Sequence, residues 1–192
     1  TFSNSGAQGG VAKYDGTTWT IYTPSNSGIP STEVADIDVD AQNNIWIGSN
    51  LGLIKFDGLN WITYNTANSG ISFNLISDVE VDESTNKVYA ATTISIDIFD
   101  GVNWSHINTG NAPFPNINLT EIDARGDTVI IGSLGGVSGA WIFDGTNWIS
   151  HFSPGHVKDV RIDNDGYFWT CGNGFVEKFD GNNWTTYSSA NT

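Results

Sequence analysis

The sequence contains a single cysteine, Cys171, so no disulfide can form within the chain. It has seven Lys and Arg residues against 21 Asp and Glu residues, which leaves a formal net charge of -14. Such a charge repels phosphate backbones and anionic lipid, and it provides no basic patch for counterion release. We therefore expect neither nucleic acid nor a membrane surface as a partner.

Long apolar runs are also missing, and no stretch approaches the roughly eighteen residues that suggest a membrane-spanning helix. The chain shows neither an initiator Met nor a signal peptide, so we expect any targeting segment to lie outside these residues or to have been removed. The acidic, Ser-, Thr- and Asn-rich composition with few lysines suits a secreted, cell-surface or periplasmic protein. An acidic cytosolic protein is the alternative.

Proline occurs only five times and methionine never, whereas glycine occurs 22 times and aromatic residues make up 12% of the chain. Aromatic residues favour strands, and glycine favours the tight turns between them. Apolar residues at helical spacing never persist beyond a turn or two. This composition predicts an all-β domain that is almost free of helix.

One motif, an aromatic residue followed by Asp-Gly-x-x-Trp, occurs five times. The copies are Tyr14-Asp15-Gly16 with Trp19, Phe56-Asp57-Gly58 with Trp61, Phe99-Asp100-Gly101 with Trp104, Phe143-Asp144-Gly145 with Trp148, and Phe179-Asp180-Gly181 with Trp184. Short aromatic or β-branched runs flank each Asp-Gly pair, which is typical of a β-hairpin. Gly tolerates the positive φ of such a turn, and Asp accepts hydrogen bonds from nearby amides, so these five Asp residues need no catalytic role.

The Asp residues of this motif are spaced by 42, 43, 44 and 36 residues, which is the length of a four-stranded propeller blade. A second strand pair precedes each later hairpin, as in Val34 to Asp40 followed by Ile45 to Gly48. In the first strand of that pair the acidic residues alternate with apolar ones, and we expect the acidic side to face water.

The predicted fold is thus an all-β β-propeller of four-stranded antiparallel blades, with about five blades or as part of a larger propeller. All 192 residues form one domain. Its approximate repeats are 1–22, 23–65, 66–108, 109–152 and 153–192. The first repeat lacks an innermost strand, and we expect further blades or domains of the same chain to complete the ring, closure as five blades by another route being the alternative.

The repeats resemble the two-component regulator propeller repeat, whose pattern runs N-S-G-L-P-S, I-x-x-D, W-I-G-T, G-L and aromatic-D-G-x-x-W. The second copy matches most closely: its elements are Asn26 to Ser31, Ile37 with Asp40, Trp46 to Ser49, Gly52-Leu53, and Phe56 to Gly58 with Trp61. The resemblance implies a bacterial extracytoplasmic sensor propeller that recognises carbohydrate fragments. It carries no site residues with it, because the motif describes the blade and not a ligand.

We therefore expect a non-enzymatic recognition module that binds glycan or protein through polar, amide-rich loops on one face of the propeller. A structural or adhesive module of a secreted or cell-surface assembly is the alternative. Candidate ligand-binding residues lie in those loops: Asn26, Asn50, Asn68, Phe114, His156 and Asn173.

Catalytic and metal sites find little support in the sequence. No nucleophile elbow is present, Cys171 has no identifiable partner, and His151 and His156 lack a third ligand at metal spacing. Asp163-Asn164-Asp165-Gly166 resembles the start of a calcium loop, but a β-turn explains it equally well. We expect no catalytic residues, metal or cofactor, and a glycan-processing enzyme is the weakest of the three alternatives.

Overall fold

The computed structural model describes residues 9–112, 119–133 and 139–189, and every regular element in these ranges is a β-strand. A two-stranded hairpin is followed by four antiparallel sheets of four strands, each formed by consecutive strands. The strands are β1 (Val11–Tyr14), β2 (Trp19–Tyr22), β3 (Val34–Val39), β4 (Ile45–Ser49), β5 (Gly52–Phe56), β6 (Trp61–Tyr64), β7 (Ile76–Asp82), β8 (Lys87–Thr92), β9 (Ser95–Phe99), β10 (Trp104–Asn108), β11 (Leu119–Arg125), β12 (Thr128–Ser133), β13 (Gly139–Phe143), β14 (Trp148–His151), β15 (Val157–Ile162), β16 (Phe168–Gly172), β17 (Phe175–Phe179) and β18 (Trp184–Ser188).

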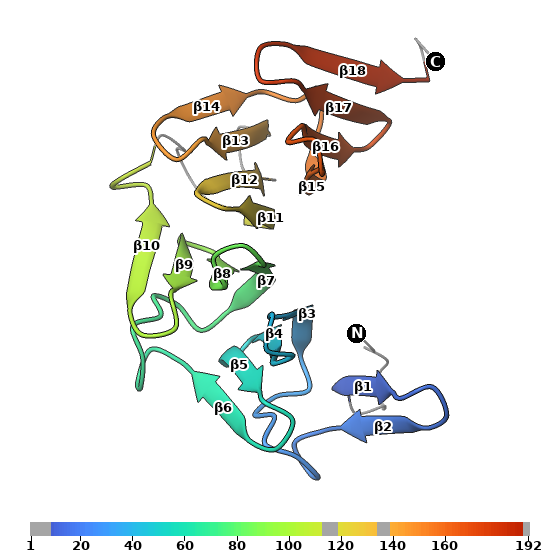
Figure 1. The fold of residues 1–192 in the computed structure, drawn as a ribbon, viewed down its shortest axis with the longest axis vertical. Coiled ribbons are helices and arrows are strands. Elements are labelled where there is room, and N and C mark those ends of the chain that lie inside the picture. Colours follow the sequence, from blue (N-terminus) through green and yellow to red (C-terminus); the bar gives the residue numbers. More distant parts are fainter. Residues whose placement is uncertain (1–8, 113–118, 134–138, 190–192) are drawn as a thin grey trace.

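The sheets are arranged as blades around a common centre (Figure 1). The inner strands β3, β7, β11 and β15 face that centre, and we name each blade after its inner strand. The outer strands β6, β10, β14 and β18 lie at the periphery. The β1–β2 hairpin lies at one end of the arc and the β15 blade at the other. This arrangement confirms the predicted propeller of four-stranded antiparallel blades.

The Asp-Gly hairpins have the structure that their residues predict. Gly58 adopts φ 95°, and Asp57 accepts hydrogen bonds from the amides of Leu59 and Asn60 at 2.8 and 2.7 Å. These backbone hydrogen bonds hold the pKa of Asp57 at about 2. Backbone hydrogen bonds are also the main cause of a lowered pKa in the Asp residues of the other four copies, namely Asp15, Asp100, Asp144 and Asp180. The motif aspartates are therefore turn anchors.

The Asp that directly follows the inner strand of the β3 blade anchors a second turn. Asp40 accepts hydrogen bonds from the amides of Gln42 and Asn44, and its other oxygen accepts the indole N–H of Trp46 at 2.9 Å. The I-x-x-D and W-I-G elements of the repeat are therefore coupled through this contact. Asp163 and Trp169 form the same pair in the β15 blade, at 2.7 Å.

Replacing Asp40 with Ala should lower the free energy of unfolding by about 2–3 kcal/mol, because several donors, including the buried indole of Trp46, lose a charged acceptor. Urea unfolding monitored by tryptophan fluorescence measures this change. The conservative variant Asp40→Asn keeps one acceptor oxygen and should lose less. Equal losses in the two variants would show that the hydrogen bonds to Asp40 do not carry the effect.

The hydrophobic core lies between neighbouring blades. Trp46 and Leu53 of the β3 blade pack with Val79, Val81 and Val88 of the β7 blade, and all five side chains are buried. Similar clusters lie between the β7 and β11 blades and between the β11 and β15 blades. Each blade thus buries both of its faces only when it has a neighbour on each side.

The prediction that the acidic side of β3 faces water is wrong. Along β3 the exposed residues are the apolar ones, including Ile37 at 48% and Val39 at 44%, whereas Asp36 and Asp38 are only half-exposed. The alternation is correct, but its orientation is reversed. The acidic side faces the β7 blade, whose inner-strand amides it contacts.

Candidate functional site

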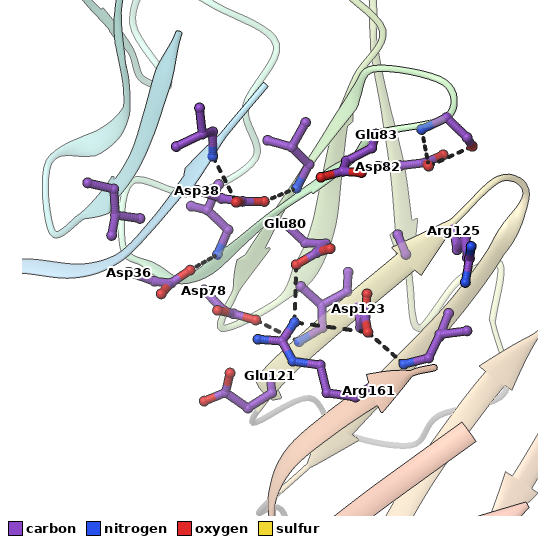
Figure 2. Close-up of a pocket in the computed structure, with 18 of the residues that line it drawn as sticks. Asp36, Asp38, Asp78, Glu80, Asp82, Glu83, Glu121, Asp123, Arg125 and Arg161 are labelled. Atoms are coloured by element: carbon purple, nitrogen blue, oxygen red, sulfur yellow. Dashed lines mark hydrogen bonds and ion pairs between the residues drawn. The ribbon is translucent and has the colours of Figure 1, made fainter. Parts of the chain in front are cut away.

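The inner strands bring acidic side chains from four different blades into one cluster. Figure 2 shows those of β3, β7 and β11, together with Arg161 of β15, around a cavity of about 540 Å³ near the centre of the arc. We call this group the acidic wall. It consists of Asp36 and Asp38 from β3, Asp78 and Glu80 from β7, Glu121 and Asp123 from β11, and Asp159 and Arg161 from β15.

Four of these carboxylates bind the backbone of the next blade. Asp36 accepts the Val79 amide at 3.1 Å, and Asp38 accepts the Val81 amide at 2.7 Å. The same contact joins Asp78 to Ile122 and Asp123 to Ile162, both at 2.6 Å. An inner strand is the edge of its sheet, so amides on its free side have no strand partner. The carboxylates supply the missing acceptors and hold adjacent blades together.

Burial and neighbouring carboxylates raise the pKa values of three acids in the acidic wall. Burial, followed by the nearby Asp123 and Asp38, raises the pKa of Glu80 to about 9. Burial, followed by Glu121 and Asp36, raises the pKa of Asp78 to about 8. Glu121 is raised in the same manner, to a pKa of about 7. At neutral pH the neutral acid form is therefore favoured for Glu80 and Asp78.

Arg161 is the cation of the acidic wall. Its guanidinium lies 3.5 Å from Glu80 and 3.9 Å from Asp123, as Figure 2 shows. In the β3, β7 and β11 blades the equivalent positions are acidic, namely Asp38, Glu80 and Asp123. Burial lowers the pKa of Arg161, but Asp123, Glu80 and other carboxylates raise it by more. One positive charge therefore offsets part of the repulsion among the carboxylates.

Four members of the acidic wall take part in contacts between neighbouring blades. Within the described ranges, no three His, Cys, Asp or Glu side chains converge as a metal-binding group. Asp36, Asp38, Asp78 and Asp123 are engaged by backbone amides, so each has a structural task.

In the part of the chain that the structure describes, no helix has the length and hydropathy to cross a membrane.

Two of the candidate asparagines shape their own loops. Asn68 accepts the Asn65 amide at 2.9 Å and donates to the Thr63 carbonyl at 2.8 Å, and Asn26 makes the equivalent contacts. Gly70, two residues after Asn68, lies very close to Trp104. A Cβ added at Gly70 would be 2.7 Å from the Trp104 side chain. The N-S-G element and the tryptophan of the hairpin motif therefore form one structural unit. Whether Asn26 and Asn68 also bind a ligand stays a prediction.

The other candidates are dispersed. Asn50 is partly buried and donates to the Glu33 carboxylate at 2.6 Å, whereas His156 and Asn173 are exposed in the loops of the β15 blade. Phe114 lies outside the described residues. The structure gathers none of these side chains into a shared pocket, so their role in ligand binding also stays a prediction.

The loops that carry these residues lie on one face of the blades. The loop between β4 and β5 is joined to the loop between β2 and β3 through Asn50 and Glu33, and the β6–β7 loop is joined to the β8–β9 turn through Ser72 and Ser95. We call this side the loop face, and the side with the Asp-Gly turns the hairpin face.

Several large apolar side chains are exposed on the loop face, although its loops are otherwise polar. Their exposed fractions range from 41% to 66%, and they are Leu51, Phe73, Leu75, Ile94 and Phe152. Sequence reasoning missed them because it weighed the amide-rich character of the loops and the proline-framed Phe114. The available signal was a large apolar residue among polar neighbours in four of the loops and turns of this face.

Comparisons with known proteins agree with this fold. No family model matches the chain, and no curated protein matches it either. Among solved structures, the extracellular domain of the hybrid two component system BT3049 from B. thetaiotaomicron is similar over 96% of this chain, with a TM-score of 0.76 and 16% identity. YCF48 bound to D1 peptide matches 82% of this chain at a TM-score of 0.59 and 14% identity. A streptogramin B lyase matches 84% at a TM-score of 0.69 and 10% identity.

These likenesses establish the fold and not a shared activity, because a sensor domain, a peptide complex and a lyase are all among them. The chain spans 27% of the BT3049 domain and 56% of the YCF48 and lyase chains. The similarity to BT3049 nonetheless matches the resemblance found in the repeat sequence. The chain therefore has a β-propeller fold built from four-stranded blades, and it shares this fold with the extracellular domain of a two component sensor.

Proposed function

We propose that this propeller is a non-enzymatic extracytoplasmic recognition module and that it binds its ligand, a protein or a glycan, through the loop face. The observation that carries the proposal is the set of exposed apolar side chains Leu51, Phe73, Leu75, Ile94 and Phe152 on that face. Apolar side chains presented among polar groups are typical of surfaces that contact a partner.

The neighbours support both parts of the proposal. The BT3049 domain is extracellular and belongs to a two component system, which favours a sensing role outside the cytoplasm. YCF48 is bound to a peptide, so this fold can present a peptide-binding surface. Aliphatic and aromatic anchors of the kind exposed here suit a protein or peptide better than a sugar, which prefers aromatic platforms with hydrogen-bonding groups.

A catalytic role is disfavoured by the state of the acidic wall. A general acid and base must be free to reach a substrate. Here Asp36, Asp38, Asp78 and Asp123 accept amides of the following blade, and Glu80 lies against Arg161. These contacts support a role for the wall in holding the blades together.

The proposal is tested by screening the native protein against a peptide library and an oligosaccharide array, followed by titration of the strongest hit. The double variant Phe73→Ala/Ile94→Ala should weaken that binding by about tenfold or more, because exposed aromatic and aliphatic anchors carry much of the energy of an interface. Both residues are exposed, so the variant should retain the melting temperature of the native protein.

The matched control is Leu59→Ala/Val102→Ala on the hairpin face, where the two side chains are 88% and 82% exposed. It should bind the hit with unchanged affinity. Equal weakening in both double variants would show that the loop face is not the binding surface. The absence of any hit in both screens would favour the structural or adhesive module.

A further inference from the structure

The last blade exposes a face that the other blades bury. Trp46 of the β3 blade is 2% exposed, but its equivalent Trp169 in the β15 blade is only partly buried. Leu53 is fully buried, whereas the equivalent Val176 is 39% exposed. The adjacent Tyr187 on β18 is 40% exposed and stacks on Trp169. In the β3 blade this same face packs against the β7 blade.

This exposed face retains the features that receive a following blade. A groove of about 110 Å³ crosses it and is lined by Asp159, Arg161, Trp169, Cys171 and Val176, among others. Asp159 occupies the position of Asp36 and Asp78, the carboxylates that accept amides of a following inner strand.

Cys171 lies where the other blades have only Gly or Ala. Its equivalents are Gly48, Ala91 and Gly132. At Gly48 a Cβ would lie 3.0–3.1 Å from Ile76 and Val79 of the following blade. The Cys171 side chain therefore projects toward the space that a following blade would fill.

The opposite end of the arc exposes the complementary half of the same interface. On β3, Ile37 and Val39 are 48% and 44% exposed, whereas the equivalent Val79 and Val81 of β7 are each 2% exposed. The reason is that the preceding sheet contains only β1 and β2 among the described residues, so no inner strand covers β3. The free edge of β1 is also open to pairing.

We propose that further blades of this same repeat cover both end faces, so that the chain is an arc of a larger propeller. The blade that covers the β15 face carries two apolar residues on its inner strand, equivalent to Val79 and Val81 on β7. A backbone amide of the same strand donates a hydrogen bond to Asp159, as the Val79 amide does to Asp36. At the other end, an inner strand pair joins the free edge of β1 and covers Ile37 and Val39. The interface that these blades would form is already present three times in the molecule, between each pair of neighbouring complete blades.

A second copy of the chain fits the β15 face less well than a further blade does. The outer half of the β3 blade is already covered, because Val11 and Tyr22 of the β1–β2 hairpin pack against Ile29, Ile47 and Ile54. A second copy would place this two-stranded hairpin against β17 and β18, and would leave the inner strands β15 and β16, with Asp159 and Cys171, uncovered. A further blade can cover the whole face.

The lone cysteine provides a direct test on the full native protein. The rate at which a maleimide labels Cys171 is measured at dilute and at high protein concentration, with the labelled peptide identified by mass spectrometry. A Thr146→Cys variant supplies the rate of an exposed turn in the same chain, and urea-unfolded protein supplies the intrinsic rate of Cys171. Burial and the nearby Asp159 raise the pKa of the folded Cys171 thiol, so the labelling rates are measured over a range of pH and compared per thiolate.

We expect native Cys171 to be labelled at least about 100-fold more slowly than the Thr146→Cys thiol, at every concentration, because a covered thiol reacts only when the face opens. Labelling within about fivefold of the exposed thiol, after correction for the unfolded rate, would overturn the proposal. Protection that disappears on dilution would also overturn it, because the occupant would then be a second copy.

A substitution on the same face gives an independent measurement. Val176→Asp should lower the melting temperature of the native protein by about 10 °C, because it would bury an unpaired charge under the further blade. The control Val102→Asp, at a side chain that is 82% exposed, should leave the melting temperature nearly unchanged. A melting temperature that is equally unaffected by both substitutions would contradict a covered β15 face.

Discussion

Raising the pH from about 5 to about 9 should destabilise the folded protein by several kcal/mol, an amount reduced by solvent screening of the partly exposed groups. The cause is the acidic wall, where Asp78, Glu80 and Glu121 have pKa values of about 8, 9 and 7 in the folded state. In the unfolded chain these carboxyl groups titrate near pH 4. Between those limits the folded state holds protons that the unfolded state has released, and each such proton changes stability by about 1.4 kcal/mol per pH unit.

The direction of this change in stability with pH follows from the raised pKa values of the three acids. The stability that these three groups contribute is fully present below their unfolded pKa and is lost as the pH rises through 7 to 9. The turn aspartates have lowered pKa values and act oppositely, because their contribution is lost as the pH falls below about 4. Maximum stability is therefore expected in mildly acidic solution, near pH 5.

Urea unfolding at pH 5, 7 and 9 measures this dependence. Glu80→Gln removes one charge without changing the size of the side chain, and it should flatten the decline above pH 7. Arg161→Gln removes the cation of the wall and should steepen it, because Glu80 and Asp123 lose their positive neighbour. A stability that stays level or rises up to pH 9 would show that the wall is not a cluster of desolvated acids.

Replacing Asp97 with Ile should lower the free energy of unfolding by about 3–5 kcal/mol. Asp97 is fully buried in β9 and accepts four hydrogen bonds, two from Ser72, one from Ser95 and one from the His106 ring. Removing this acceptor leaves buried donors without partners, which is among the most costly single changes in a protein. Ser72 lies in the β6–β7 loop, so the loss should also loosen the part of the loop face that carries Phe73.

The chain itself supplies the compensating change. In the β3 blade the position of Asp97 is occupied by Ile54, and the position of Ser72 is occupied by Pro30, which has no amide to satisfy. The triple variant Ser72→Pro/Asp97→Ile/His106→Thr copies the β3 solution, since Thr63 stands at the position of His106. It should recover at least half of the stability lost in the single variant. Chemical denaturation of both variants decides this, and a triple variant as unstable as the sum of its parts would refute the compensation.

The fold was largely predictable from the sequence because its signals are local and repeated. The Asp-Gly turn needs only a glycine at positive φ and a carboxylate two and three residues before the amides it binds, and five copies at blade spacing leave one architecture. The four strands of each complete blade follow from period-two patterns between such turns.

The orientation of the inner strands was not predictable from the same patterns. An alternating acidic and apolar strand normally turns its acids to water, but in β3 the acids turn toward the next blade. The reason is long-range: a blade edge has free amides at its centre, and only the neighbouring blade can supply acceptors. The sequence shows the alternation of Asp36 and Asp38, but not the partner that decides its direction.

The candidate site was less predictable than the fold for a related reason. Asn26 and Asn68 carry the polar character that suggests ligand binding, yet both amides are used within their loops. Phe73 and Ile94 gain significance only because folding brings their loops together through Ser72 and Ser95. A surface formed by separate repeats cannot be assembled from the composition of each loop.

The claim that the inner carboxylates hold adjacent blades together is tested most directly by amide hydrogen exchange in the native protein and in an Asp78→Ala variant. In the native protein the amide of Ile122, which donates to Asp78 at 2.6 Å, should be strongly protected although it lies at the edge of its sheet. In the variant its exchange should accelerate by about 100-fold or more, while the amide of Ile162, which donates to Asp123, stays protected. An Ile122 amide that exchanges as fast in the native protein as in the variant would contradict the claim, and would leave the acidic wall free for chemistry with a ligand.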